Sequence, residues 1–137
     1  MRNTASPSPP SVRAHHAAGK PILAECGGMM ALVDSLETVA GQGFPMIGLI
    51  PGKVIMQKRL AAIGMQKVAL SGSNAALRGH TFHYSRFESE LQPFTRATRT
   101  NGGEGEAVFR IGNLTASYFH AYFASSPEAA ATLFSRR

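Results

Sequence analysis

Residues 21–30 have the sequence Pro21-Ile22-Leu23-Ala24-Glu25-Cys26-Gly27-Gly28-Met29-Met30 and include the only cysteine of the chain. A short apolar run leads directly into Glu-Cys-Gly-Gly, and a helix-like stretch follows. This order is typical of a nucleophile elbow, in which the nucleophile stands on a sharp turn between a strand and a helix. The two glycines fit that reading, because only glycine tolerates the crowding and the unusual backbone angles expected there.

A thiol in this turn would lie near the amino end of the next helix. The unpaired amides and positive dipole of a helix end favour thiolate over thiol. The alternative is a buried cysteine that acts only as a small apolar side chain, which is common for a lone cysteine. The glycines favour the first reading, with Cys26 as nucleophile and the amide of Gly27 as donor to an oxyanion.

Composition indicates one globular unit. A chain of 137 residues with 44% hydrophobic content can bury one sizeable core. A single cysteine excludes internal disulfides and agrees with a cytoplasmic location. No run approaches the roughly 20 apolar residues that span a bilayer, so no membrane partner is expected. We expect a disordered Pro/Ser-rich leader at residues 1–11 and a folded unit at residues 12–137.

The net charge of +6 raises the possibility of nucleic-acid binding. The basic residues are scattered from Arg2 to Arg137, however, without the basic, aromatic-interleaved strand of RNA-binding modules. A small basic RNA-associated protein is therefore a disfavoured alternative. A surface with excess positive charge, or attraction of a polyanionic substrate, fits better.

Apolar spacing and turn residues predict the order of elements. Helices are expected at residues 12–18 (a helix end), 28–40 and 127–134, the last capped by Ser125 or Ser126; strands are expected at 22–24, 44–50, 53–57, 77–87, 107–111 and 114–123. Residues 58–70 are ambiguous between a helix followed by a strand and two short strands. Residues 71–74 are expected to form a turn, residues 95–105 a polar hairpin-like loop, and Gly112-Asn113 a turn.

Four segments, in order, resemble a known family. Residues 20–28 resemble the nucleophile segment of the class I glutamine amidotransferase domain of cobyrinate a,c-diamide synthases. Three further stretches fit the same family: Gly48-Leu49-Ile50-Pro51-Gly52, Arg78-Gly79-His80-Thr81-Phe82-His83-Tyr84-Ser85 and Ser117-Tyr118-Phe119-His120-Ala121-Tyr122-Phe123. Together they cover roughly residues 17–125, so the resemblance extends over most of the chain.

The resemblance implies an α/β fold: a partial flavodoxin-like class I glutamine amidotransferase fold, three-layered around a mixed sheet, with its early strands missing. It also implies hydrolysis of glutamine to supply ammonia for ATP-dependent amidation of corrin carboxylates in cobalamin biosynthesis. No cofactor is expected in this chain, because ATP and Mg²⁺ would bind a synthetase domain that it lacks. The expected partners are glutamine, a corrin held by that domain, and a separately encoded N-terminal half or a second copy of the chain.

The resemblance also assigns site residues. His120 matches the catalytic base that would pair with Cys26, and His83, Tyr84 and Ser85 match a segment that contributes to the glutamine pocket. For this second segment, aromatic strand packing around a hydrogen-bonded histidine is an equal alternative. Strand alternation places His80 and His83 on opposite faces.

The chain departs from the family pattern after the proposed base. Tyr122 stands where the family has a second histidine, and no carboxylate is found where triad enzymes have one, so a Cys-His dyad is expected. The His120 ring would be oriented by a backbone carbonyl or by Tyr122. Glu25 is expected to have a packing role, His15 and His16 are expected at the surface, and no metal site is expected.

A second, non-enzymatic function stays open at this point. A degenerate, inactive amidotransferase-like remnant could act as a binding or assembly module, because the fold's first half and its oxyanion loop are not found in this sequence.

Overall fold

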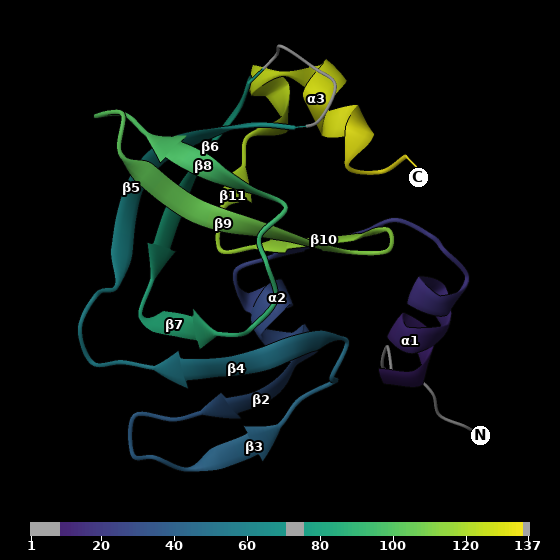
Figure 1. Cartoon of the computed structure of the whole chain (residues 1–137), viewed down its shortest axis with the longest axis vertical. Coiled ribbons are helices and arrows are strands. Elements are labelled where there is room, and N and C mark those ends of the chain that lie inside the picture. The colour runs from purple at the N-terminus through teal and green to yellow at the C-terminus, as the bar shows by residue number, and fades with distance from the viewer. Residues whose placement is uncertain (1–8, 71–75, 136–137) are drawn as a thin grey trace.

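The computed structural model describes residues 9–70 and 76–135, which form two sheets and few helices (Figure 1). The helices are α1 (Pro9–Ala17), α2 (Gly27–Leu32) and α3 (Pro127–Thr132), with a 3-10 turn η1 (Phe123–Ser125). The strands are β1 (Ile22–Glu25), β2 (Val33–Glu37), β3 (Gly43–Pro45), β4 (Ile50–Met56), β5 (Ala62–Ala69), β6 (Ala76–His83), β7 (Ser85–Glu88), β8 (Thr95–Arg99), β9 (Glu104–Ile111), β10 (Leu114–Ser117) and β11 (His120–Ala121). The expected mixed α/β class is confirmed, with strands predominating.

The larger sheet has seven strands in the order β1-β10-β9-β8-β5-β6-β11. Strand β1 runs parallel to β10, and the other pairs are antiparallel, so the sheet is mixed as expected. Only two residues separate the end of β10 from the start of β11, at the far edge of the sheet. A side chain of β1, Glu25, accepts a hydrogen bond from the Ala121 amide of β11 at 2.8 Å. The two edge strands therefore approach each other, and the sheet curls.

Two hydrophobic clusters stabilise this arrangement. One packs α2 and the smaller sheet against β1 and β10; its buried members are Ala24, Met29, Leu32, Val33, Ile50, Val54, Leu114, Ala116 and Tyr118. The other fills the curled sheet under α3, which covers its upper end in Figure 1; its members are Val68, Leu70, Leu77, Ala97, Val108, Phe119, Ala129, Ala130 and Leu133. Strand β1 serves both clusters, because Ala24 faces the first and Leu23 packs against the second.

The smaller sheet has the order β3-β2-β4-β7 and lies below α2 in Figure 1. The helix expected at residues 28–40 is therefore wrong, because α2 ends at Leu32 and β2 begins at Val33. Val33 pairs with Ile50, and both side chains are fully buried. Tertiary pairing of a β-branched residue thus overrides the helical spacing of the apolar residues.

The strand expected at residues 44–50 is also wrong, because β3 ends at Pro45 and β4 begins only at Ile50. The Pro51-Gly52 pair does not end a strand but lies inside β4. Gly52 has a φ of 139°, and a side chain there would collide with the ring of Phe87 and the backbone of Glu88 on β7. Glycine is needed at this position because two strands approach closely there.

Other expectations are confirmed or refined. Residues 53–57 lie largely in β4, the ambiguous residues 58–70 contain the single strand β5, and the strand expected at 77–87 divides into β6 and β7. The expected loop 95–105 includes β8, and the late strand expected at 114–123 already ends at Ser117, after the confirmed turn at Gly112-Asn113. Ser126 caps α3 by accepting from the Ala129 amide. The turn at 71–74 and residues 1–8 of the expected leader lie outside the described residues, and α1 begins at Pro9.

Candidate active site

The turn expected at Cys26 is present at the junction of β1 and α2. Cys26 has a φ of 50°, and within residues 9–70 and 76–135 no other non-glycine residue has a positive φ. Its amide donates to the carbonyl of Ser117 at 2.8 Å, and its carbonyl accepts from the Met30 amide at 2.9 Å. Such a strained conformation in a non-glycine residue persists only where the surroundings hold it, and it is frequent at active sites.

The two glycines after Cys26 do not relieve crowding, which corrects the sequence interpretation. A Cβ built on Gly27 would meet no described atom within 4 Å, and one on Gly28 would only touch the Ala24 side chain at 4.0 Å. Neither residue has a positive φ. The unusual backbone angle belongs to Cys26, and the position of a Cβ on Gly27 faces open space.

The surroundings of Cys26 favour the protonated thiol. Burial raises the pKa of Cys26 above its ordinary 9.0, a hydrogen bond with the Gly27 backbone opposes the rise, and the carboxylates of Glu106 and Glu25 add to it. From the nearby helix end alone, the sequence predicts a lowered pKa for Cys26. The backbone effect does lower the pKa, but burial and two negative charges outweigh it.

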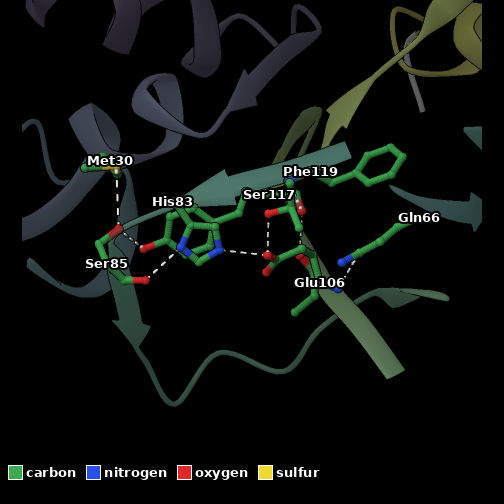
Figure 2. A network of polar contacts seen from close by, with 10 residues as sticks. Met30, Gln66, His83, Ser85, Glu106, Ser117 and Phe119 are labelled. Atoms are coloured by element: carbon green, nitrogen blue, oxygen red, sulfur yellow. Dashed lines mark hydrogen bonds and ion pairs between the residues drawn. The ribbon is translucent and has the colours of Figure 1, made fainter. Parts of the chain in front are cut away.

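Figure 2 shows a largely buried pair of His83 and Glu106, and the Glu106 charge acts on the Cys26 thiol. His83, at the end of β6, contacts Glu106 of β9, with 2.7 Å between Nε2 and Oε2. The same Oε2 accepts from the Thr81 hydroxyl at 2.6 Å, and His83 Nδ1 lies 2.8 Å from the carbonyl oxygen of Ser85. Although burial alone would raise it, the pKa of Glu106 is lowered by the hydrogen bonds from His83 and Thr81 and by the charges of His83 and Arg99.

Tyr118 connects this ion pair to the elbow. Its ring stacks on the His83 ring with 3.6 Å between centroids, and its hydroxyl lies 2.8 Å from the Ser85 hydroxyl. Ser85 in turn contacts the sulfur of Met30 on α2 at 3.9 Å. Burial, opposed by the Ser85 hydrogen bond and reinforced by the charges of Glu106 and Cys26, raises the pKa of Tyr118 to about 12, so the phenol stays neutral.

His120 lies on β11, at the edge of the larger sheet. The opposite facing of His80 and His83 is confirmed, since His80 is exposed and His83 is buried. His120 pairs with His80 across β11 and β6, and the two rings stack at 5.1 Å. Gly79 permits this contact, because a side chain there would collide with the His120 carbonyl and the Phe119 ring. The ring that stacks on His120 is thus that of His80, and Tyr122, the side chain expected to orient His120, is largely exposed.

The structure thus brings together only some of the residues expected in the site. Cys26, His83 and Ser85 belong to one neighbourhood with Tyr118 and Glu106, whereas Tyr84 is 43% exposed and packs edge to face against Phe82. Glu25 has the expected structural role through its bond to β11. The two early histidines lie on α1: His15 is exposed, and His16 is half-buried, with Nε2 2.9 Å from the Ile111 carbonyl.

Sequence reasoning missed Glu106 and the role of Tyr118. Glu106 comes just after a stretch with loop composition, and nothing in its spacing connects it to a histidine 23 residues earlier. Tyr118 lies inside a family-like segment, and its aromatic, strand-forming surroundings gave no sign of a stacked histidine. Glu106 reaches His83 through successive strand pairs, because β6 pairs with β5, β5 with β8, and β8 with β9, which carries Glu106.

A cavity of about 550 Å³ lies next to the ion pair. His83, Ser85, Glu106 and Tyr118 line it together with three arginines (Arg86, Arg96 and Arg99), while Cys26 does not. Arg86 pairs with Glu88 and Arg96 with Glu104, so Arg99 is the arginine of the three without an ion pair to a described residue. Across the described residues, no group of three or more His, Cys, Asp or Glu side chains could hold a metal ion.

Comparison with known proteins identifies the family. Residues 6–128 match the CobB/CobQ-like glutamine amidotransferase domain. The chain belongs to this family. A cobyrinate a,c-diamide synthase of Herminiimonas arsenicoxydans is 52% identical over 126 residues, which are 91% of this chain and 28% of that protein. A hydrogenobyrinate a,c-diamide synthase of Pseudomonas aeruginosa is 52% identical over 124 residues, which are 90% of this chain and 28% of that protein. A cobyrinate a,c-diamide synthase of Salmonella typhimurium is 38% identical over 127 residues; the match covers 85% of this chain and 28% of that protein.

This amidotransferase-family chain therefore spans little more than a quarter of the length of the curated relatives it matches. None of the helices in the described part of the chain is both long and apolar enough to cross a membrane.

Proposed function

We propose that this chain hydrolyses the side-chain amide of glutamine, with Cys26 as nucleophile, His120 as base and the Gly27 amide as oxyanion donor. The Cys26 sulfur attacks the amide carbon while its proton passes to the imidazole. The resulting imidazolium protonates the amide nitrogen, which leaves as ammonia when the C–N bond breaks, and water then hydrolyses the thioester to glutamate and restores the thiol. The observation that carries this proposal is the φ of 50° at Cys26, on the strand-to-helix turn of a glutamine amidotransferase domain.

The protonation state of Cys26 explains why a base is required. Burial and two nearby carboxylates raise the pKa of Cys26, so the resting thiol holds its proton at neutral pH. A thiol is a weak nucleophile until that proton is removed. The reaction therefore depends on a neutral imidazole that can accept it.

Two histidines compete for that role, and hydrogen bonding favours His120. Both ring nitrogens of His83 are occupied, one by the Ser85 carbonyl and the other by Glu106, so this ring has no free lone pair. The His120 ring is half-buried, and no described residue hydrogen-bonds to its nitrogens. The bond from Glu25 to the Ala121 amide connects the residue before Cys26 with the residue after His120, which supports pairing of the two segments.

The open space over Gly27 supports its role as oxyanion donor. The Gly27 backbone interacts with the Cys26 sulfur, and no described atom lies within 4 Å of the position of a Cβ. A substrate carbonyl can approach the amide there without displacing a side chain. The loss of one such donor typically reduces turnover about 10²–10³-fold in other hydrolases.

The amino-acid end of glutamine would face the cavity beside the ion pair. His83 and Ser85 line this cavity, and Arg99 supplies a guanidinium without an ion pair to a described residue, which suits an α-carboxylate. Tyr118 lines the same cavity and interacts electrostatically with Cys26. Tyr84, although part of the family-like segment, would contribute to the surface instead.

The ammonia would then serve ATP-dependent amidation of a corrin carboxylate in the cytoplasm. This extension follows the names of the relatives, which are cobyrinate and hydrogenobyrinate a,c-diamide synthases. ATP, Mg²⁺ and the corrin would bind a synthetase domain outside these residues, with a separately encoded half or a second copy of the chain as partner. The lone cysteine agrees with a reducing compartment.

A second candidate, an inactive family member that serves as a binding or assembly module, is favoured by the raised pKa of the Cys26 thiol. Radiolabelled glutamine separates the two functions. After incubation and acid quenching, wild-type protein should retain label as a thioester, and the Cys26→Ala variant should retain none. Equal retention by the two proteins, or none by either, would contradict glutamine hydrolysis by this chain.

A further inference from the structure

A second cavity, of about 500 Å³, opens on the solvent-facing side of the larger sheet, where residues of β5, β6 and β8 and of the loop after β8 line it. Side chains alternate along two of these strands: Val68 and Leu77 are buried, whereas Lys67 and Arg78 are exposed. Of the residues that line this cavity, only Arg99 also lines the cavity beside the ion pair. It is therefore a separate cavity.

Three side chains that can donate hydrogen bonds form a row across this second cavity. Lys67 of β5 is the register partner of Arg78 on β6 and of Thr98 on β8, and β5 lies between those two strands in the sheet (Figure 1). Directly opposite residues of antiparallel strands point to the same face. Neighbouring strands lie about 4.8 Å apart, so the guanidinium, the ammonium and the hydroxyl are spread over roughly 10 Å. A row of that length exceeds a single phosphate or carboxylate group.

No carboxylate of the described residues balances the two cations. Neither Lys67 nor Arg78 forms an ion pair with a described acidic side chain. Glu104, which pairs with Thr98 from β9, lines the other cavity and is paired with an arginine there. Residues 38–87 contain six Lys and Arg residues and no Asp or Glu, whereas the rest of the chain contains eight basic and eight acidic residues. The whole net charge of +6 therefore belongs to the segment that includes β5 and β6.

A role in solubility or in edge protection does not account for this pair of cations. Exposed charges keep proteins soluble, and lysines on edge strands prevent sheets from pairing with one another. Strand β5 is not an edge strand, since it has neighbours on both sides. Like charges directly opposite each other destabilise a sheet, and cations placed apart would serve solubility equally well. An anion bound between the two cations would remove that repulsion.

We propose that this second cavity binds a small molecule with two or more anionic groups, and that Lys67 and Arg78 are its charged contacts and Thr98 its hydroxyl donor. Arginine binds a phosphate or carboxylate group through two hydrogen bonds, and lysine binds either group as a point charge. Met65, exposed on the same face of β5, gives the cavity an apolar wall. Arg99 has no assigned role here because it lines both cavities. The site lies outside the machinery for glutamine hydrolysis and does not depend on that function.

Isothermal titration calorimetry of the full chain with sodium tripolyphosphate tests the site. Near neutral pH lysine and arginine are charged, and at about 0.15 M salt exposed charges more than about 8 Å apart are largely screened from each other. Wild-type protein should bind one equivalent of the anion. Lys67→Gln and Arg78→Gln should each weaken binding about tenfold, since each removes a charge-assisted hydrogen bond. Thr98→Val, which removes only a neutral donor, should weaken it by a smaller factor of about three.

The matched control is the double variant Lys58→Gln/Arg59→Gln. These two exposed residues belong to the same segment without acidic residues, lie outside the cavity and form no ion pair with a described residue. The control removes as much charge as Lys67→Gln/Arg78→Gln. It should keep the affinity within about twofold of wild type, because distant charges are screened, whereas Lys67→Gln/Arg78→Gln should lose measurable binding. Thermal melts check folding, and Arg78→Gln should melt no lower than wild type because it relieves a repulsion.

Titration with citrate in place of tripolyphosphate distinguishes the two sources of negative charge. Tighter binding of tripolyphosphate would assign the site to phosphate-bearing ligands, and tighter binding of citrate would assign it to polycarboxylates. The proposal would be overturned if folded wild-type protein showed no saturable binding of either anion. It would also be overturned if the Lys58→Gln/Arg59→Gln control lost as much affinity as Lys67→Gln/Arg78→Gln, because binding would then follow net charge rather than this cavity.

Discussion

The Glu25 carboxylate accepts a 2.8 Å hydrogen bond from the backbone amide of Ala121. This contact connects β1, which carries the nucleophile turn, with β11, which carries His120. Strands β1 and β11 are the outermost strands of the larger sheet, so the bond also closes the curl of that sheet. The candidate site therefore depends on a long-range contact between two short segments.

This contact predicts the effect of removing the carboxylate. Glu25→Gln keeps the size and an acceptor oxygen, and should retain the closure. Glu25→Ala leaves the Ala121 amide without its acceptor and should destabilise the fold by about 1–3 kcal/mol. Chemical denaturation of both variants measures the difference, and equal stability of the two would contradict the structural role of this side chain.

The thiol itself should titrate above its ordinary value. Burial and the carboxylates raise the pKa of Cys26 above 9.0, so the protonated form stabilises the folded state. That stabilisation is fully present below 9.0 and is lost as the pH rises through the folded-state pKa. The alkylation midpoint of the folded protein should therefore exceed that of protein in denaturant. A lower midpoint in the folded protein would show that the helix end dominates instead.

Acid should affect the same site through Glu106. Its pKa in the folded state lies below the ordinary 4.5, so the carboxylate contributes stability that is fully present above that pH. The contribution is lost as the pH falls through the folded-state pKa. Denaturation curves recorded from neutral pH into this acid range should show a steeper loss of stability in wild type than in Glu106→Gln. Parallel losses would mean that the carboxylate is not held in its charged form.

The open space at Gly27 predicts how alanine substitutions at Gly27 and Gly28 change stability and labelling. Gly27→Ala and Gly28→Ala both add a methyl group that meets no close contact, and alanine favours helices by roughly 0.5–1 kcal/mol over glycine. Both variants should be at least as stable as wild type. Only Gly27→Ala should slow the retention of label from glutamine, because its methyl group fills the approach to the thiol. Equal labelling of both variants would remove Gly27 from the site.

The last helix offers a stability prediction without a functional one. The Ser126 hydroxyl accepts from the Ala129 amide at the start of α3. Ser126→Ala should therefore cost about 1 kcal/mol, as loss of an N-cap does elsewhere. Ser135→Ala, which removes a hydroxyl that donates to the Ala131 carbonyl near the end of α3, is the control and should cost less. A larger loss at Ser135 would contradict the capping role of Ser126.

The sequence was informative where local chemistry determines structure. The apolar strand into Cys26, the turn at Gly112-Asn113 and the cap at Ser126 all depend on neighbouring residues, and all are found. The helix expected at residues 28–40 is wrong because Val33 pairs with Ile50, a contact that helical periodicity cannot reveal. Glu106 was missed for the same reason, since its partner His83 reaches it only through long-range strand pairing.

The central claim is that Cys26 attacks glutamine with His120 as its base. It is tested most directly by the labelling rate of Cys26 with a diazo-ketone analogue of glutamine at neutral pH, followed by intact-protein mass spectrometry. Labelling should be much faster in folded wild-type protein than in unfolded protein, and His120→Asn should abolish the excess, while His80→Asn should leave most of it. Equal rates in folded and unfolded protein, or an undiminished rate in His120→Asn, would contradict the account.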